Sequence, residues 1–221
     1  MATVILGART SSPWFLSFAI ALLASMTYVG HVDAEAKGDA NSRLIEPGIR
    51  VGPVTAHSQE IDLVRLLGRG NVRRENLDVG EGFKRPGTKL FPGTDDEIWL
   101  FWQEDAYKIP ERVVIADRGQ KWRTAEGVGS GVTLETLIRL NGRHFDLHGF
   151  GWDYGGTVAS WQGGRLRRFG DKLTVRVGPS VDLNGLPESD LDAVIGEKVI
   201  SSQTPTLKKL NVMVYELIVK F

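Results

Sequence analysis

The alternating polar and apolar residues from His144 to His148 are the ones best suited to metal chemistry. Alternate side chains of a β-strand point to one face, so His144, Asp146 and His148 would follow one face at intervals of ~7 Å. Two imidazoles and a carboxylate are suitable ligands for a divalent cation. A straight strand spreads them too far apart for one ion, so chelation would require a bulge. The alternative is that Phe145 and Leu147 face the core and the polar residues form the solvated face.

The segment from Gly149 to Gly156 combines glycines, aromatic side chains and a carboxylate. Glycines permit a bulged backbone, and Trp152 and Tyr154 have large apolar faces with a polar edge. Such a loop is suited to binding a sugar ring, a peptide or a partner protein. The predicted binding residues are Phe150, Trp152, Asp153 and Tyr154, with Phe150 as an anchor. The alternative is a bulged hairpin whose aromatic residues complete the core.

Common catalytic motifs do not occur in the sequence. There is no Gly-x-Ser-x-Gly elbow, no phosphate-binding glycine-rich loop with lysine and no His-Glu-x-x-His. The absence of cysteine excludes a thiol nucleophile, a thiolate zinc site and disulfide bonds. A Ser-His-Asp arrangement would have to use His57, His144 or His148. The sequence therefore favours binding over catalysis, with an unrecognised hydrolase as an alternative.

Two segments that end at Gly68 and Gly142 share the pattern of a short amphipathic helix. The two glycines are placed to take the left-handed conformation that ends a helix. Ser58 and Thr133 are the candidate residues for capping the N-termini. The apolar residues expected on one face are Ile61, Val64 and Leu67 in the first helix, and Leu134, Leu137 and Ile138 in the second.

Several segments have the composition or the alternation of β-strands. They are residues 71–79, 97–102, 112–116, 144–150, 157–162, 172–177 and 211–221. The Gly- and Pro-rich stretch 80–93 is predicted as a turn, and 189–195 as a short helix. The predicted fold class is α+β, with two related units of one short helix followed by about three antiparallel strands, plus a C-terminal strand. We predict a single domain over 43–221, with 44–126 and 127–221 as candidate subunits.

A Gly-x-Thr helix start and a Leu-x-x-Leu-x-Gly helix end occur at Gly131-Val132-Thr133, Leu137, Leu140 and Gly142. With tandem helix-plus-antiparallel-sheet units, the chain resembles the β-lactamase inhibitory protein and the small outer-membrane-assembly lipoproteins of the SmpA/OmlA type. The segments 50–54 and 149–154 also resemble uncharacterised bacterial periplasmic proteins. The first unit lacks the Gly-x-Thr start, and the chain lacks a lipobox cysteine. The resemblance implies a scaffold that binds other proteins.

Residues 1–36 have the pattern of a cleavable signal peptide. The apolar run from Trp14 to Ala24 is followed by small residues, and Ala34-Glu35-Ala36 resembles a cleavage site. The alternative is a retained anchor, although the uncharged stretch from Trp14 to Gly30 is short for the ~30 Å of a bilayer core. Residues 37–42 are predicted to be a flexible leader. The expected location is therefore periplasmic or secreted.

The balance between acidic and basic residues argues against a polyanionic partner. The 27 basic and 27 acidic residues cancel, so net charge gives no reason to expect nucleic acid. We expect an exported, non-catalytic protein-interaction or inhibitor-like module whose partner is another protein. It would meet a membrane only transiently, through its signal peptide. The alternative is a small-ligand or metal-binding periplasmic protein, and only under that alternative is a divalent metal expected as a cofactor.

Overall fold

The computed structural model describes residues 39–116 and 118–221, except for the side chain of residue 184. The predicted signal peptide lies outside the described residues, as do residues 37 and 38 of the predicted leader. Residues 39–42 form a turn, in which the Ser42 N–H donates to the Asp39 carbonyl oxygen at 3.1 Å. The described part of the leader is therefore joined to the start of the domain by a defined turn.

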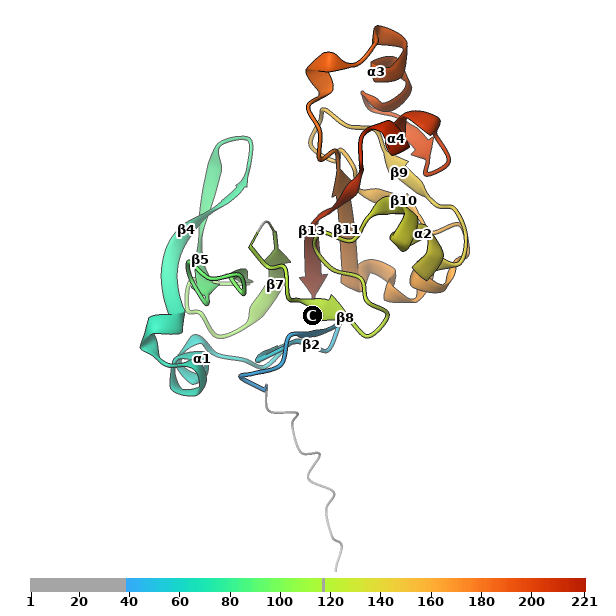
Figure 1. The fold of residues 1–221 in the computed structure, drawn as a ribbon. Coiled ribbons are helices and arrows are strands. Elements are labelled where there is room, and N and C mark those ends of the chain that lie inside the picture. Colours follow the sequence, from blue (N-terminus) through green and yellow to red (C-terminus); the bar gives the residue numbers. More distant parts are fainter. Residues whose placement is uncertain (1–38, 117) are drawn as a thin grey trace, which may run out of the picture. The chain divides into compact units, whose positions relative to one another are not determined.

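The largest sheet has the strand order β11-β13-β7-β6-β5-β4, and all neighbouring strands are antiparallel (Figure 1). Aromatic and β-branched residues favour this structure, most clearly in β6, which reads Ile-Trp-Leu-Phe-Trp. The predicted C-terminal strand is present as β13, and it lies between β7 and β11. The bounds are β4 Val72–Gly80, β5 Phe83–Leu90, β6 Ile98–Trp102, β7 Pro110–Ile115, β11 Leu173–Gly178 and β13 Met213–Lys220.

Strand β5 occupies most of the stretch 80–93 that we predicted as a turn, so that prediction is wrong. Only residues 81 and 82 connect β4 to β5. Pro86 is accommodated because β5 pairs with β6 only from Thr88 to Leu90. Its missing N–H therefore removes no bond to β6, while on the other side it lies opposite Asn76 of β4.

Two smaller sheets flank the large one. The first has the order β3-β2-β1-β8, in which β1 and β8 are parallel. The second has the order β10-β9-β12 and is antiparallel. Their bounds are β1 Leu44–Glu46, β2 Arg50–Val51, β3 Val54–Thr55, β8 Arg123–Thr124, β9 Asp146–His148, β10 Val158–Ser160 and β12 Val199–Ser201.

The two predicted helices are present, but only the second begins and ends as predicted, because Gly68 after the first helix has φ 84° and ψ 149°, outside the left-handed helical region. Thr133 caps α2, because its hydroxyl oxygen accepts from the Thr136 N–H at 3.3 Å, and Gly142 ends this helix at φ 80°. Helix α1 begins after Gln59, whereas Ser58 accepts from the Thr55 N–H at 2.9 Å. The helices are α1 Glu60–Leu67, α2 Leu134–Asn141, α3 Glu188–Val194 and α4 Pro205–Lys209, with 3-10 helices η1 Arg69–Asn71, η2 Arg165–Lys172 and η3 Leu183–Gly185.

The buried face of α1 matches the predicted one only in part, since the half-buried Leu67 packs against the core as predicted. Ile61 is 49% exposed, whereas Leu63 and the carboxylate residue Glu60 are buried. The apolar periodicity could not reveal this, because Glu60 is buried by hydrogen-bonding partners that lie elsewhere in the chain. In α2, by contrast, the predicted Leu134 and Leu137 are buried.

The fold class is α+β, as predicted, but the two halves do not repeat the same plan. Four consecutive strands, β4 to β7, follow α1 and form neighbouring pairs. After α2, β9 and β10 pair in the small sheet, whereas β11 joins the large sheet beside β13. The strands that follow the two helices are therefore paired differently, so the two predicted units do not share one pattern of strand pairing.

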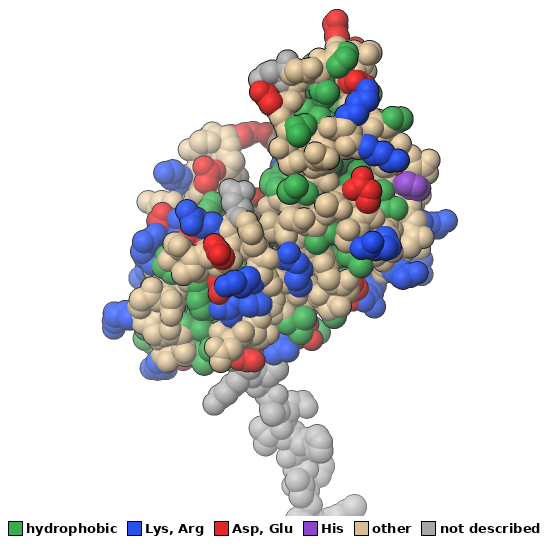
Figure 2. Space-filling view, viewed as in Figure 1, with side chains coloured by type: hydrophobic (Ala, Val, Ile, Leu, Met, Phe, Trp, Pro, Cys, Tyr) green, Lys and Arg blue, Asp and Glu red, His purple; other side chains and the backbone are tan. Residues whose placement is uncertain are grey.

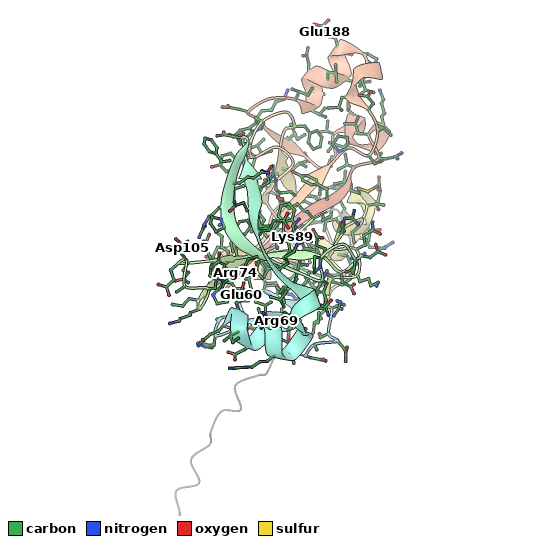
Figure 3. The ribbon with its side chains drawn as sticks, turned by 90° about the vertical axis from the view of Figure 1, so that its left-hand side faces the viewer. Glu60, Arg69, Arg74, Lys89, Asp105 and Glu188 are labelled. Carbon is green, nitrogen blue, oxygen red and sulfur yellow. The ribbon has the colours of Figure 1, made fainter. Side chains whose placement is uncertain are left out.

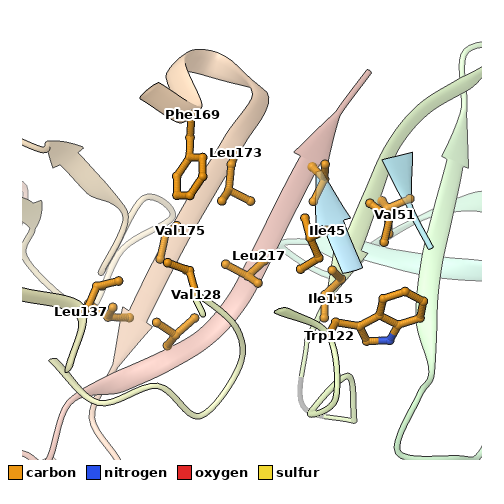
Figure 4. Close-up of a cluster of buried hydrophobic side chains, with 14 of the residues drawn as sticks. Ile45, Val51, Ile115, Trp122, Val128, Leu137, Phe169, Leu173, Val175 and Leu217 are labelled. Carbon is orange, nitrogen blue, oxygen red and sulfur yellow. The ribbon is translucent and has the colours of Figure 1, made fainter. Parts of the chain in front are cut away.

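One hydrophobic core runs through the described residues, which belong to a single compact unit. It includes Ile45 near the start, Trp122 in the middle and Leu217 in β13 (Figure 4). Phe145 also belongs to it. A smaller cluster of Leu77, Phe101 and Val114 is packed with Trp99 on the opposite face of the large sheet. The core thus joins the two candidate subunits.

Candidate functional site

A pocket of about 460 Å³ lies beside the predicted aromatic loop, and we name it the aromatic pocket. The residues that define it are Phe150, Trp152, Arg176, Leu183, Met213 and Tyr215. They come from the loop 149–156, from β11 and the chain just after it, and from β13. Mainly apolar walls with a few polar groups are typical of ligand and side-chain binding pockets.

Backbone contacts hold the aromatic loop against its neighbours. Phe150 is buried, and its N–H donates to the Val194 carbonyl oxygen at 2.7 Å. Gly156 has φ 72°, and a Cβ there would overlap the Val177 carbonyl oxygen, so this position requires glycine. The loop is thereby fixed between the end of α3 and β11.

Trp152 is half-buried and rigidly oriented. Its indole N–H donates to the Gly149 carbonyl oxygen at 2.8 Å, which leaves the apolar body of the ring for the pocket wall. The ring also contacts Tyr154 edge-on, at 5.3 Å between centroids, and His148 at 5.4 Å. Tyr154 is 62% exposed. Trp152 is therefore neither a core residue nor a free surface residue.

Arg176 provides the charged group of the pocket. It pairs with Glu216 at 3.0 Å and donates to the Asp153 carbonyl oxygen at 2.8 Å, so it joins β11, β13 and the loop. Its guanidinium lies 5.4 Å from the centre of the Tyr215 ring. Within the described residues, its buried Nε has no hydrogen-bond partner. Burial raises the pKa of the Tyr215 hydroxyl further above its ordinary value of 10.0, so this group stays protonated at physiological pH.

Asp153 lies at the outer side of the loop, next to the tip of the β4–β5 hairpin. Its carboxyl group is close enough to that of Glu81, in the two-residue hairpin turn, for the two groups to share a proton. Hydrogen bonding of the protonated Glu81 to Asp153, and the repulsion between the two carboxylates, raise the pKa of Glu81. The four predicted binding residues thus divide between the pocket wall (Phe150 and Trp152) and its outer rim (Asp153 and Tyr154).

His144, Asp146 and His148 do not converge. Strand β9 covers only Asp146–His148, so His144 lies before it, but the side chains alternate as predicted, with Phe145 and Leu147 fully buried. His144 Nδ1 lies 3.2 Å from the Ser202 hydroxyl, and Asp146 is hydrogen-bonded to the Gln162 side chain. His148 instead contacts the aromatic loop. Among residues 39–116 and 118–221, no group of three or more His, Asp or Glu side chains is arranged to hold a metal ion.

The contact between His144 and Ser202 brings a serine next to one of the histidines that a hydrolase would need. Ser202 is 4% exposed, and its hydroxyl oxygen accepts from the Phe145 N–H at 2.9 Å. A nucleophile must reach its substrate. The bond to the backbone indicates that this serine fixes the chain before β9.

Arg176, Leu183, Met213 and Tyr215 were not among the residues predicted from the sequence. Strand alternation could have shown that Arg176 and Tyr215 point away from the core, since Val175, Val177 and Val214 are buried. Sequence patterns could not show that the loop 149–156 covers this part of the sheet.

Searches of protein-family models, curated proteins and solved structures found no match to the chain. The fold and the pocket therefore define the class only as an α+β domain with an aromatic pocket. The resemblance to the β-lactamase inhibitory protein and to the SmpA/OmlA type stays a prediction. In the described part of the chain, no helix is both long enough and apolar enough to span a bilayer.

Proposed function

We propose that the chain is an exported, non-catalytic recognition module that binds another protein by holding one large apolar side chain of that partner in the aromatic pocket. The observation that carries the proposal is the pocket of about 460 Å³ walled by Phe150, Trp152, Leu183 and Met213. Anchors of this kind dominate the binding energy of many protein interfaces. The export part rests on the signal-peptide pattern of residues 1–36.

The rim of the pocket supports a protein partner. Tyr154 is 62% exposed, and it lies in the same loop as Trp152. Phe83 is 67% exposed, and it directly follows the hairpin turn that contacts Asp153 through Glu81. Exposed aromatic groups beside a pocket are typical of protein interfaces. A small ligand inside the pocket would not contact these rim residues.

The charge distribution supports a partner without strong net charge. Acidic and basic side chains are interspersed on the face shown in Figure 2. The sequence balance of 27 basic and 27 acidic residues agrees with this. A polyanion such as nucleic acid is usually bound by a surface with excess basic charge.

A small-ligand protein is the second candidate. Arg176 and Tyr215 support it, because a few polar groups in an apolar pocket commonly fix the orientation of a ligand. The two candidates differ in what they require of Tyr154: a protein partner covers this exposed ring, whereas a ligand inside the pocket is held mainly by the pocket wall.

Peptides displayed on phage and selected against the purified chain test the proposal. We expect the selected peptides to share a Trp, Phe or Leu anchor. Trp152→Ala should weaken their binding at least ~10-fold and Tyr154→Ala several-fold, because the first removes a pocket wall and the second part of the rim. Affinity is measured by calorimetry for each variant.

Ile49→Ala is the matched control, since Ile49 is 60% exposed and lies between β1 and β2, away from the pocket. It should leave peptide affinity unchanged. Equal binding by Trp152→Ala, Tyr154→Ala and the control would refute the proposal. Loss of binding with Trp152→Ala alone, for peptides and small aromatic compounds alike, would favour the small-ligand candidate.

A further inference from the structure

A second pocket, of about 500 Å³, is formed by α1 with η1, the start of β4 and the loop between β6 and β7. We name it the α1 pocket and define it by Glu60, Val64, Arg69, Arg74, Tyr107 and Lys108. It shares no lining residue with the aromatic pocket. Its volume is within the range of small-molecule sites.

A hydrogen-bonded network fixes the base of the α1 pocket. The Trp102 indole N–H donates to the Thr88 hydroxyl at 2.9 Å, and this hydroxyl donates to Glu60 Oε1 at 2.6 Å. Arg74 Nε donates to Glu60 Oε2, also at 2.6 Å. Both carboxylate oxygens therefore have protein partners, so Glu60 serves to position Arg74 and is not a free ligand for a cation.

Arg74 is held in a defined orientation. Its guanidinium stacks over the Tyr107 ring at 3.9 Å, while its two terminal nitrogens make no hydrogen bond to any described residue. The Tyr107 carbonyl oxygen accepts from the Glu60 N–H at 3.0 Å, and Tyr107 has φ 57°. Non-glycine residues with positive φ cluster at ligand-binding sites, where surrounding contacts maintain the strain. The stacked pair thus presents free donors at a preorganised position.

Two further cations line the pocket from different elements. Arg69 comes from η1, Lys108 from the β6–β7 loop, and both are exposed. Across the described ranges, neither makes an ion pair. Glu60 and Arg74 lie between Arg69 and the loop that carries Asp105 (Figure 3). Three cations and one carboxylate line the pocket, and Asp105 is not part of its wall.

We propose that the α1 pocket binds a small organic anion with a flat apolar body. The anionic group is held by the free donors of Arg74 and by Arg69 and Lys108, because guanidinium and ammonium groups form strong charge-assisted bonds with carboxylates, sulfonates and phosphates. The apolar body packs on Val64 and on Ile61, which is 49% exposed in the same wall. This contact would explain why Ile61 is exposed.

Calorimetric titration of the full chain with naphthalene-2-sulfonate tests this site. The double variant Arg69→Gln, Lys108→Gln should weaken binding at least ~10-fold, because it removes two of the three cations. The neutral analogue naphthalene-2-sulfonamide should bind the wild type at least ~10-fold more weakly than the sulfonate, because it lacks the charge. Thermal unfolding followed by circular dichroism checks that the double variant is folded.

Arg167→Gln, Lys208→Gln is the matched control: it removes one arginine and one lysine that are also exposed and lie on η2 and α4. It should leave the affinity for the sulfonate within about twofold of the wild type, as expected for surface charges outside the site. Equal weakening by both double variants would overturn the proposal, since only net charge would then matter. So would equal affinity for the sulfonate and the sulfonamide, or a loss of sulfonate binding in Trp152→Ala but not in the Arg69/Lys108 variant.

Discussion

A single residue can determine the stability of this fold where it buries a charged group, as Glu60 does. It is 8% exposed, and its carboxylate is satisfied by Thr88 and Arg74. Burial of a charged group is tolerated only when hydrogen bonds compensate for the lost water. Apolar periodicity assigns such a position to the surface, which is why the sequence analysis did not place Glu60 on the buried side of α1 and placed the exposed Ile61 there instead.

Replacement of this carboxylate should destabilise the domain. We expect Glu60→Ala to lower the free energy of unfolding by about 1–3 kcal/mol, because the fully buried Thr88 hydroxyl loses its acceptor. Urea unfolding followed by tryptophan fluorescence measures the change. Glu60→Gln should lower the free energy of unfolding by less, since its amide oxygen can still accept a hydrogen bond from the Thr88 hydroxyl. Asp62→Ala, on the exposed side of α1, should change stability by less than about 0.5 kcal/mol, and a similar loss in both alanine variants would contradict the assigned role of Glu60.

The β4–β5 hairpin is the element whose contacts should depend on pH. The pKa of its turn residue Glu81 is raised, because protonated Glu81 can hydrogen-bond to Asp153 and ionised Glu81 is repelled by the Asp153 charge. A raised pKa means that the protonated form is favoured in the folded state. The interaction between Glu81 and Asp153 is therefore fully present below the ordinary Glu pKa of 4.5. It weakens as the pH rises through the raised pKa of Glu81.

Carboxyl chemical shifts measured by NMR from pH 3 to 7 check this expectation. Glu81 should titrate above the ordinary pKa of 4.5, and Asp153→Asn should remove that upward shift because the neighbouring charge is gone. Glu104→Gln, in the exposed β6–β7 loop, serves as the control and should leave the titration of Glu81 unchanged. An ordinary pKa for Glu81 in the wild type would show that the hairpin does not contact the loop through this pair.

Elements with strong local patterns were predictable, and elements defined by distant partners were not. β6 was evident from its aromatic and β-branched residues, and α2 from Thr133 and Gly142, because each signal lies within the element. β5 was missed because its glycine and proline argue against a strand; both lie in the part of β5 that pairs with β4 and not with β6. In the candidate site, the loop aromatics were visible in the sequence, whereas Arg176 and Tyr215 reach it only through tertiary packing.

At the scale of the whole molecule, β13 connects the two halves. Leu217 lies opposite Ile115 of β7 and Val175 of β11, and all three are buried in the single core. A shared core with continuous strand pairing gives cooperative unfolding. The candidate subunits 44–126 and 127–221 should therefore unfold together.

Leu217→Ala tests this cooperativity. We expect a loss of about 2–5 kcal/mol in the free energy of unfolding, because the side chain is fully buried. Far-ultraviolet circular dichroism and tryptophan fluorescence should show one coincident urea transition, in the variant as in the wild type. Two separate transitions, of which only one responds to the substitution, would mean that the halves are independent domains.

The position of β13 also affects how the protein is made. Leu217 pairs with Ile115, and a ribosome adding about 5–20 residues per second needs roughly 5–20 s to make the chain between them. Throughout that interval the nascent chain carries β7 with one side unpaired, and unpaired strand edges promote association between chains. Growing chains of this protein should therefore need a chaperone, or a delay in folding, until the last strand of the sheet has been synthesised.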